Sequence, residues 1–312
     1  MTRIIPRELI KHLEWTPGQT PPAQPIANPI PIVNPVQTSP FSIDDIMNGK
    51  TFYDGSMPKA LRQAIEYAGS SGIVANMPEF VAAKAKAEKS HAFWKNWYTV
   101  LTEENIGIDK KGSFYTRGEP VLVVMHGGGI LTPDRIQQAY DEGLISNSAK
   151  YRNDEFDALL EGRLLDGTSF PLYRLEDIKD GRSNLPHQFG VVLPYKTAQD
   201  TKSGYHQKKP FLENPLVLAR TAGSHDYLES FYEKAKASDG DLGNYHPFSS
   251  RDATIPQGRV LFVNSTSGGL YGNCNLNGNG RFVGVASEAH VAREKVLEAR
   301  VQSALESRKP FE

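Results

Sequence analysis

The segment VVMHGGGIL at residues 123–131 ends an apolar run with a histidine and three consecutive glycines. Glycine adopts positive φ readily and lets the backbone approach another group closely. Gly127, Gly128 and Gly129 are therefore expected to present free N–H groups to a ligand. The imidazole of His126 changes charge near neutral pH and can act as an acid, a base or a hydrogen-bond donor. These residue types predict an anion-binding turn in which His126 is the candidate catalytic residue.

A helix is expected to start directly after the glycines. Thr132 occupies the N-cap position, Pro133 the first helical position and Asp134 the first turn. The positive end of a helix dipole stabilises an anion, and ligands of open α/β sheets bind outside the carboxyl ends of the strands. An alternative stays open, in which the glycines only let the helix pack close to the strand and His126 is structural.

Two further loops carry polar side chains after predicted strands. The loop ARTAGSHDY supplies Arg220, Ser224 and His225, and the loop VNSTSGGLYGN supplies Asn264 and Ser265. Arginine suits the bidentate binding of a carboxylate or a phosphate. We expect these residues to meet the histidine of the first loop at one end of a sheet and to bind the ligand there. In the alternative, each loop is a surface turn.

Together the three loops predict a protein that binds a small anionic metabolite, either phosphorylated or carboxylated. Enzymatic action of the hydrolase or transferase type is a further hypothesis, because the chain contains no redox-cofactor motif. The alternative function is a noncatalytic protein that assembles into a homo-oligomer through a proline-rich N-terminal arm. The sequence leaves the substrate, the cofactor and the reaction class unidentified.

Several motifs with a known chemistry are absent. HGGG at residues 126–129 is similar to the oxyanion-hole segment of lipases and esterases of the α/β-hydrolase type. The G-x-S-x-G motif that carries their nucleophile is missing, which argues against that class. The dinucleotide-binding and P-loop glycine motifs are missing too, and the histidines lack zinc-binding spacing, so no metal site is predicted.

The segment NCNLNGNGRFVG at residues 273–284 imitates the start of a calcium-binding loop. Asn275, Asn277 and Asn279 are followed by Gly280, but the twelfth position is Ala286 instead of a bidentate glutamate. A loop without carboxylates lacks the ligands that calcium requires. We therefore predict an Asn- and Gly-rich turn before a strand.

The composition restricts the partners and the compartment. With 312 residues, of which 39% are hydrophobic and 23% charged, the chain has the composition of a globular protein. Its formal net charge of -1 disfavours nucleic acid as a partner. A single cysteine, Cys274, excludes an intrachain disulfide and fits a reducing compartment. Because no segment has signal-peptide or membrane-span character, we expect a cytoplasmic protein without a membrane partner.

Three regions are expected along the chain. Residues 1–40 comprise a short helix and a proline-rich extended arm, whose apolar residues favour docking on a protein surface over a free linker. Residues 41–118 are predicted to be helical and to pack on the main domain. In this region Trp94, Trp97 and their apolar neighbours fall at helical spacing and are expected in the core.

Residues 119–312 are predicted to form the α/β main domain. Strands are expected in EPVLVVMH, QFGVVLPY, NPLVLART, GRVLFVNST and RFVGVA, which are short apolar runs bounded by turn signals. Helical segments alternate with these strands. Unbroken apolar strands that alternate with helices predict an α/β fold with a mainly parallel or mixed central sheet flanked by helices.

Overall fold

A sheet of nine strands forms the larger part of the fold. The computed structural model describes residues 41–237, 240–265, 269–273 and 275–287, which all belong to one compact unit. The strands of this sheet are β3 (Tyr98–Ile108), β4 (Pro120–His126), β5 (Ala149–Lys150), β6 (Leu172–Arg174), β7 (Phe189–Pro194), β8 (Gly204–His206), β9 (Leu242–Tyr245), β10 (Gln257–Val263) and β11 (Leu270–Tyr271). Their order is β6-β7-β4-β3-β10-β11-β9-β8, and β5 also pairs with β10.

The strand directions make this a mixed sheet. The pairs β6–β7 and β9–β11 are parallel, whereas the other described pairs are antiparallel. Because β4 and β10 are each antiparallel to β3, they run in the same direction on either side of it. Their last residues, His126 and Val263, therefore lie at the same end of the sheet. The predicted α/β content and the mixed sheet are confirmed, with antiparallel pairs in the majority.

The central strand β4 is buried on both faces. Leu122 and Val124 pack into one hydrophobic cluster, and Val121, Val123 and Met125 pack into another. Each of these side chains has no exposed surface. A strand covered on both faces needs an apolar residue at every position, which accounts for the unbroken apolar run in the sequence.

A second, three-stranded sheet joins segments far apart in the sequence. It consists of β1 (Lys50–Asp54), β12 (Gly280–Val285) and β2 (Ile73–Val74), with β12 antiparallel to both neighbours. The helix α3 (Met57–Ala68) covers this sheet with a buried stripe that includes Ala60, Leu61 and Ala64. The backbone N–H of Arg281 in β12 donates to the Thr99 hydroxyl of β3 at 3.1 Å, so the two sheets are linked.

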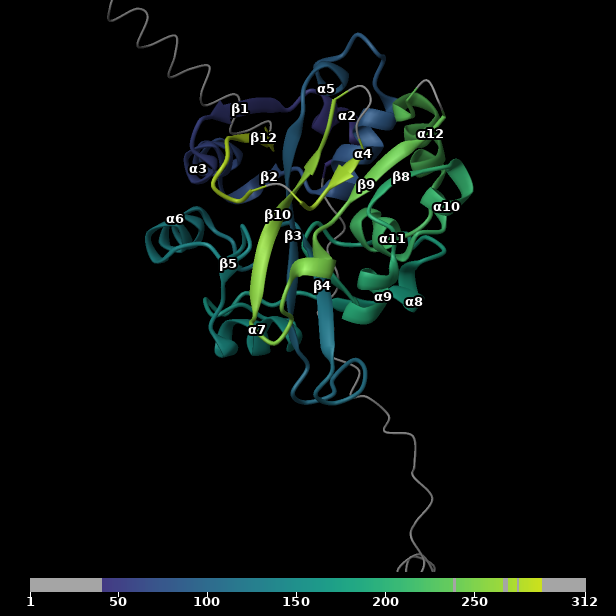
Figure 1. Cartoon of the computed structure of the whole chain (residues 1–312). Helices are drawn as coiled ribbons and strands as arrows, with labels where there is room; N and C mark the ends of the chain where they lie inside the picture. The colour runs from purple at the N-terminus through teal and green to yellow at the C-terminus, as the bar shows by residue number, and fades with distance from the viewer. Residues whose placement is uncertain (1–40, 238–239, 266–268, 274, 288–312) are drawn as a thin grey trace, which may run out of the picture. The chain divides into compact units, whose positions relative to one another are not determined.

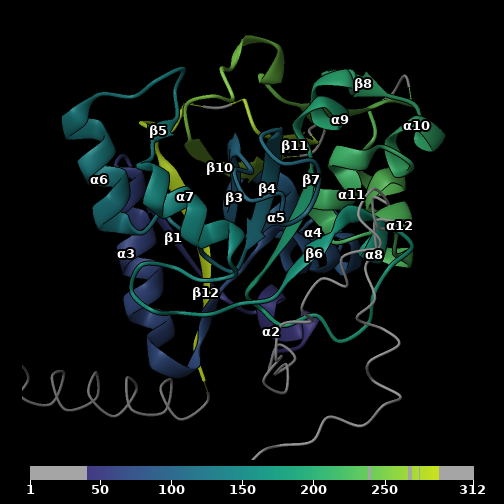
Figure 2. The same ribbon diagram turned by 90° about the horizontal axis from the view of Figure 1, so that it is seen from below.

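The remaining elements are short helices. They are α2 (Ile43–Met47), α4 (Met77–Lys86), α5 (Ala92–Lys95), α6 (Pro133–Glu142), α7 (Asn153–Leu160), α8 (Leu175–Ile178), α9 (Tyr195–Asp200), α10 (Lys208–Leu212), α11 (Pro215–Thr221), α12 (Asp226–Ala235) and the 3₁₀ helices η1 (Gly69–Ser71) and η2 (Phe248–Ser250). Figures 1 and 2 show α6 and α7 on one side of β3, β4 and β10, and α8 to α12 on the other. Among the described residues, no helix is both long and apolar enough to cross a membrane.

The segment NPLVLART, predicted as a strand, forms helix α11 instead. The side chain of Asn214 accepts hydrogen bonds from the backbone N–H groups of Leu216 at 2.9 Å and Val217 at 3.3 Å. Pro215 then occupies the first helical position, where its fixed φ and missing N–H are tolerated. These start signals outweigh the strand preference of the apolar residues that follow.

The region 41–118 contains strands as well as the predicted helices. β1, β2 and β3 all fall within it, and helix α4 ends at Lys86. Trp94 lies in α5 and is fully buried, as expected of a core residue, whereas Trp97 is half-buried just before β3. The β-branched pair Thr99 and Val100 favours the strand that follows. The proline-rich arm of residues 1–40 and Cys274 lie outside the described residues.

Candidate functional site

His126, the candidate catalytic residue, is fully buried at the end of β4. Its Nε2 lies 3.0 Å from the carbonyl oxygen of Ala219, and its Nδ1 lies 3.2 Å from the hydroxyl of Thr102. Because a carbonyl only accepts, Nε2 carries the proton and the Thr102 hydroxyl donates to Nδ1. Burial lowers the pKa of His126 to about 3. The imidazole is therefore neutral, and it joins β4, β3 and α11 through both of its nitrogens.

The three glycines form the expected tight turn. Gly127 and Gly128 have φ of 77° and 96°, and a Cβ on Gly127 would collide with the carbonyl of His187. The N–H groups that end this turn point at a carboxylate of the protein itself. The backbone N–H groups of Ile130 and Leu131 donate to Glu103 at 3.1 and 2.9 Å. The donors of the turn are therefore already occupied by a carboxyl group of the protein itself.

Glu103 fills the position that the sequence assigns to a ligand. The side chain has no exposed surface. Its burial raises the pKa to about 7, while the hydrogen bonds from the turn act in the opposite direction. Any external anion would have to displace this carboxylate to reach the same donors.

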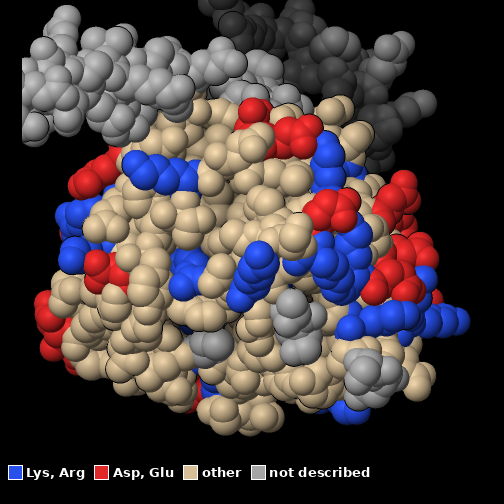
Figure 3. Space-filling model, turned by 90° about the horizontal axis from the view of Figure 1, so that it is seen from above, with Lys and Arg blue, Asp and Glu red and all other residues tan. Residues whose placement is uncertain are grey.

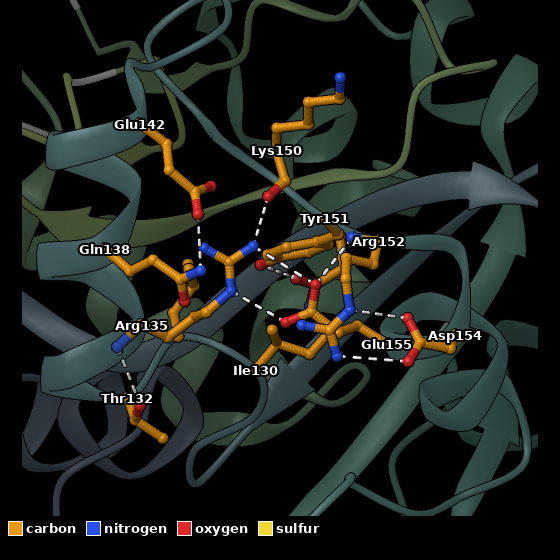
Figure 4. A network of polar contacts seen from close by, with 12 residues as sticks. Ile130, Thr132, Arg135, Gln138, Glu142, Lys150, Tyr151, Arg152, Asp154 and Glu155 are labelled. Atoms are coloured by element: carbon orange, nitrogen blue, oxygen red, sulfur yellow. Dashed lines mark hydrogen bonds and ion pairs between the residues drawn. The ribbon is translucent and has the colours of Figure 1, made fainter.

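The start of α6 is also engaged in internal contacts, which Figure 4 shows from close by. The hydroxyl of Thr132 accepts from the backbone N–H of Arg135 at 3.2 Å, as expected of an N-cap. The guanidinium of Arg135 forms an ion pair with Glu155 at 2.9 Å and also donates to the carbonyl of Lys150. Glu155 in turn accepts from the backbone N–H of Arg152 at 2.7 Å. This network ties α6 to α7.

Arg220, the predicted anchor of the ligand, is fully buried at the end of α11. Its guanidinium lies 2.8 Å from a carboxylate oxygen of Glu104 in β3, which also has no exposed surface. It further donates to the side-chain oxygen of Asn244 at 2.5 Å and to the carbonyl oxygens of Tyr245 at 3.0 Å and Leu270 at 3.3 Å. Arg220 thus binds a carboxylate, and this carboxylate belongs to the core.

Ser224 and His225 lie at the start of α12, away from the partners of Arg220. Ser224 is exposed, and its backbone N–H donates to the carbonyl of Lys179 at 2.8 Å. The imidazole of His225 donates to the carbonyl of Ala222 at 2.9 Å and stacks on Tyr227, with the ring centroids 4.9 Å apart. These contacts fix the turn between α11 and α12.

Asn264 and Ser265 follow β10, and their carbonyl oxygens both accept from the ammonium group of Lys84. The distance to Ser265 is 3.2 Å. Ser265 also donates its backbone N–H to the side-chain oxygen of Asn264 at 2.8 Å. Of the predicted site residues, the structure therefore places His126 beside the backbone of α11, and it places Asn264 and Ser265 over a lysine that the sequence analysis did not select.

A cluster of buried polar residues lies near the Arg220–Glu104 ion pair. Arg251 and Arg259 both donate to the hydroxyl of Ser148, at 2.9 and 2.8 Å. Arg259 also donates to the carbonyl of Gly272 at 2.7 Å. Burial, together with the neighbouring charge of Arg259, lowers the pKa of Arg251 to about 9. These arginines hold the ends of β5, β10 and β11 together.

The connection between β11 and β12 presents polar side chains on an anchored backbone. Leu276 is buried, its N–H donates to the carbonyl of Asn147 at 3.3 Å, and its carbonyl accepts from the hydroxyl of Tyr140 at 2.5 Å. The exposed residues on either side are asparagines, namely Asn273, Asn275, Asn277 and Asn279. The contacts of Leu276 thus anchor the backbone at this residue, while the four asparagine side chains are exposed.

An aromatic cluster with one arginine lies beside this connection. The guanidinium carbon of Arg281 lies 4.8 Å from the ring centroid of Tyr53 and 5.3 Å from that of Trp97. Tyr53 is 52% exposed, and its hydroxyl accepts from the side-chain amide of Asn279 at 3.0 Å. We call Tyr53, Trp97, Arg281 and the four exposed asparagines the recognition surface. The alternation of asparagine with other residues from 273 to 279 is the sequence signal for this surface, although the sequence pattern predicts only a turn there.

No group of three or more His, Cys, Asp or Glu side chains within the described ranges is arranged to hold a metal ion.

Comparison with known proteins gives a structural neighbour but no family. No model of a protein family matches the chain, and no curated protein matches its sequence. A solved structure described as "Accommodation of massive sequence variation in Nanoarchaeota by the C-type lectin fold" is similar, with a TM-score of 0.58 and 26% sequence identity. The similarity covers 76% of this chain and 97% of that chain. The described fold is therefore similar to the C-type lectin fold.

Proposed function

We propose that the chain is a recognition protein, in which a scaffold similar to the C-type lectin fold presents the recognition surface to a binding partner. The neighbouring structure is described as one whose fold accommodates massive sequence variation. A scaffold with that property separates the residues that maintain the fold from those that contact the partner. The connection between β11 and β12 has this separation.

The observation that carries the proposal is the alternation of burial along this connection. Gly272, Leu276 and Gly280 are buried, whereas the four asparagines between them are exposed. Exposed side chains can change at little cost to the core. The antigen-binding loops of antibodies are rich in Asn, Gly, Ser and Tyr, and these types make up most of residues 264–280. Tyr53 and Trp97 add the aromatic surface that is enriched at interfaces.

The small anionic metabolite expected from the glycine-rich loops stays a prediction, as do the hydrolase or transferase activity, assembly through the proline-rich arm and the cytoplasmic location. Two internal contacts favour the recognition surface over these loops as the binding site. The amides of the glycine turn donate to Glu103, and Arg220 is paired with Glu104. An external ligand at those loops would compete with carboxylates that are already in place.

A randomised library tests the proposal. The four asparagines at 273, 275, 277 and 279 are replaced by all amino acids in a surface-display library of the full chain, and the fraction of protease-resistant clones is measured. A matched control library randomises four exposed positions of α6, namely Gln137, Gln138, Asp141 and Glu142. We expect the two libraries to give similar folded fractions, because all eight side chains are exposed and the hydrogen bonds that some of them form lie at the surface.

Binding is then selected from both libraries against one soluble target protein. We expect binders from the asparagine library and none, or far fewer, from the α6 library, because only the former lies beside the aromatic cluster. A low folded fraction in the asparagine library would show that these side chains support the fold. Equal recovery of binders from both libraries would show that the proposed surface has no special role. Either result would refute the proposal.

A further inference from the structure

Three lysines from separate segments converge around the indole of Trp94. The ammonium nitrogens of Lys84, in α4, and of Lys89 lie 4.7 and 4.3 Å from the centroid of this ring. Lys234, in α12, donates to the carbonyl oxygens of Ala85 at 2.6 Å and Ala87 at 3.3 Å. The Trp94 Nε1–H donates to the same Ala87 oxygen at 3.2 Å, which brings the third ammonium group to the edge of the ring. We call these three residues the lysine triad.

The lysine triad has no carboxylate partner within the described residues, because none of its ammonium groups forms an ion pair there. Neighbouring lysines do find such partners. Lys86 pairs with Asp44 at 2.6 Å, and Lys236 pairs with Glu233 at 2.7 Å. Glu88, the one carboxylate in residues 86–95, is exposed and forms no ion pair with the triad. No carboxylate of the described residues therefore neutralises these ammonium groups, whose described partners are backbone carbonyls and the indole ring.

Mutual repulsion and burial act on the triad in the same direction. Lys84 is fully buried, and this burial, with the nearby charge of Lys89, lowers its pKa to about 7. Burial and the charge of Lys234 lower the pKa of Lys89. The carbonyl end of α4 supplies only about half a negative charge near Lys234. A doubly charged anion would supply the remaining compensation.

The surroundings leave this charge accessible. Lys89 is exposed and Lys234 is partly exposed, whereas Lys84 is buried. Figure 3 shows the upper side of Figure 1, where α5 and α12 lie, and on this face lysine and arginine side chains are interspersed with aspartate and glutamate. With a formal net charge of -1, the whole chain does not attract anions in general, so the attraction is local.

We propose that Lys84, Lys89 and Lys234 form a binding site for a phosphate or sulfate group. Lysine binds such groups as a point charge, and the two accessible ammonium groups of Lys89 and Lys234 suit an anion that carries two negative charges. Lys89 and Lys234 contact the oxyanion, and the buried Lys84 stabilises its charge. This site is independent of the recognition surface, since it uses none of the residues that define it.

Isothermal titration of the full chain with inorganic phosphate and with sulfate tests the site, with sodium chloride holding the ionic strength constant. We expect saturable binding of at least one of the two anions at neutral pH. In Lys89→Ala/Lys234→Ala, the dissociation constant should rise by at least about tenfold, because both accessible ammonium groups are lost. Both residues lie at the surface, and thermal melting confirms that the variant folds.

The matched control is Lys179→Ala, which removes one exposed ammonium group beyond α8. We expect it to bind the anion as tightly as the unmodified chain. An equal loss of affinity in this control would show that only overall charge matters. The proposal would also be overturned if neither anion bound saturably above the chloride background, or if the double variant bound as well as the unmodified chain.

Discussion

Replacing Arg220 separates its structural role from a ligand-binding one. We consider Arg220→Met, which keeps an unbranched apolar side chain but removes the guanidinium. In the structure this group holds the carboxylate of Glu104 at 2.8 Å and three uncharged acceptors, on Asn244, Tyr245 and Leu270. A residue that anchors a ligand would be dispensable for folding, whereas a residue with these four partners is essential to it.

The expected loss of stability follows from these contacts. Removing one partner of a buried ion pair costs about 3–5 kcal/mol, because the other charge stays buried and unpaired. Each uncharged acceptor that loses its donor adds about 1 kcal/mol or more, unless water enters. The loss in Arg220→Met should therefore reach about 6 kcal/mol, which is comparable to the whole stability of many domains, about 5–15 kcal/mol. Arg220→Lys should lose less, since the charge near Glu104 remains.

A double-mutant cycle with Glu104→Gln measures the coupling. Glu104→Gln removes the negative charge and leaves the other three acceptors of Arg220 in place. In the double variant no unpaired charge is buried. Its loss of free energy of unfolding should therefore be smaller than the sum of the losses in the two single variants by at least about 2 kcal/mol. Urea unfolding followed by tryptophan fluorescence gives the four free energies. A loss below about 1 kcal/mol in Arg220→Met, or additive effects in the cycle, would refute the argument.

Three further predictions concern the core and the recognition surface. The pKa of His126 falls from 6.5 to about 3 on folding, so its stabilising effect is complete above pH 6.5 and is lost as the pH falls toward 3. The free energy of unfolding of His126→Gln should then vary less with pH over this range, and equal pH slopes in urea unfolding would contradict this. Gly258→Ala should lower the melting temperature strongly, because its Cβ would overlap the hydroxyl of Tyr151. The control Gly55→Ala should leave the melting temperature nearly unchanged, because its Cβ meets no atom within 4 Å. Similar melting temperatures of the two variants would contradict the packing around Gly258. Leu276→Ala should cost about 2–5 kcal/mol and Asn277→Ala less than about 0.5 kcal/mol in the same unfolding assay, and the reverse order would contradict the division between anchor and surface.

The strands buried on both faces could be predicted from the sequence. The apolar runs before His126 and around residues 188–195, 258–266 and 281–286 all contain strands in the structure. Their signal is local, because a strand covered on both sides needs an apolar residue at each position. The run at Leu216 has a similar texture but follows an Asn-Pro helix start, so the capping residues decide its conformation.

The partners of the site residues could not be predicted, since they lie far along the chain. Arg220 pairs with Glu104, a separation of 116 residues, and His126 contacts Ala219, a separation of 93 residues. In the sequence, Glu103 and Glu104 stand together with Asn105 and resemble an exposed polar stretch. In the structure all three are buried in the longest strand, where they bind donors from both sides of the sheet.

The distribution of internal carboxylates decides which cationic groups and amides remain available to a ligand. Glu103 occupies the glycine turn, and Glu104 occupies Arg220, so the two positions with the strongest sequence signal for an anion are already neutralised. Charge that the fold leaves uncompensated is a better indicator of a ligand than charge that the sequence places in a suitable motif. By that criterion an external anion binds at the lysine triad, where burial and repulsion act together and no carboxylate of the described chain is paired with the ammonium groups.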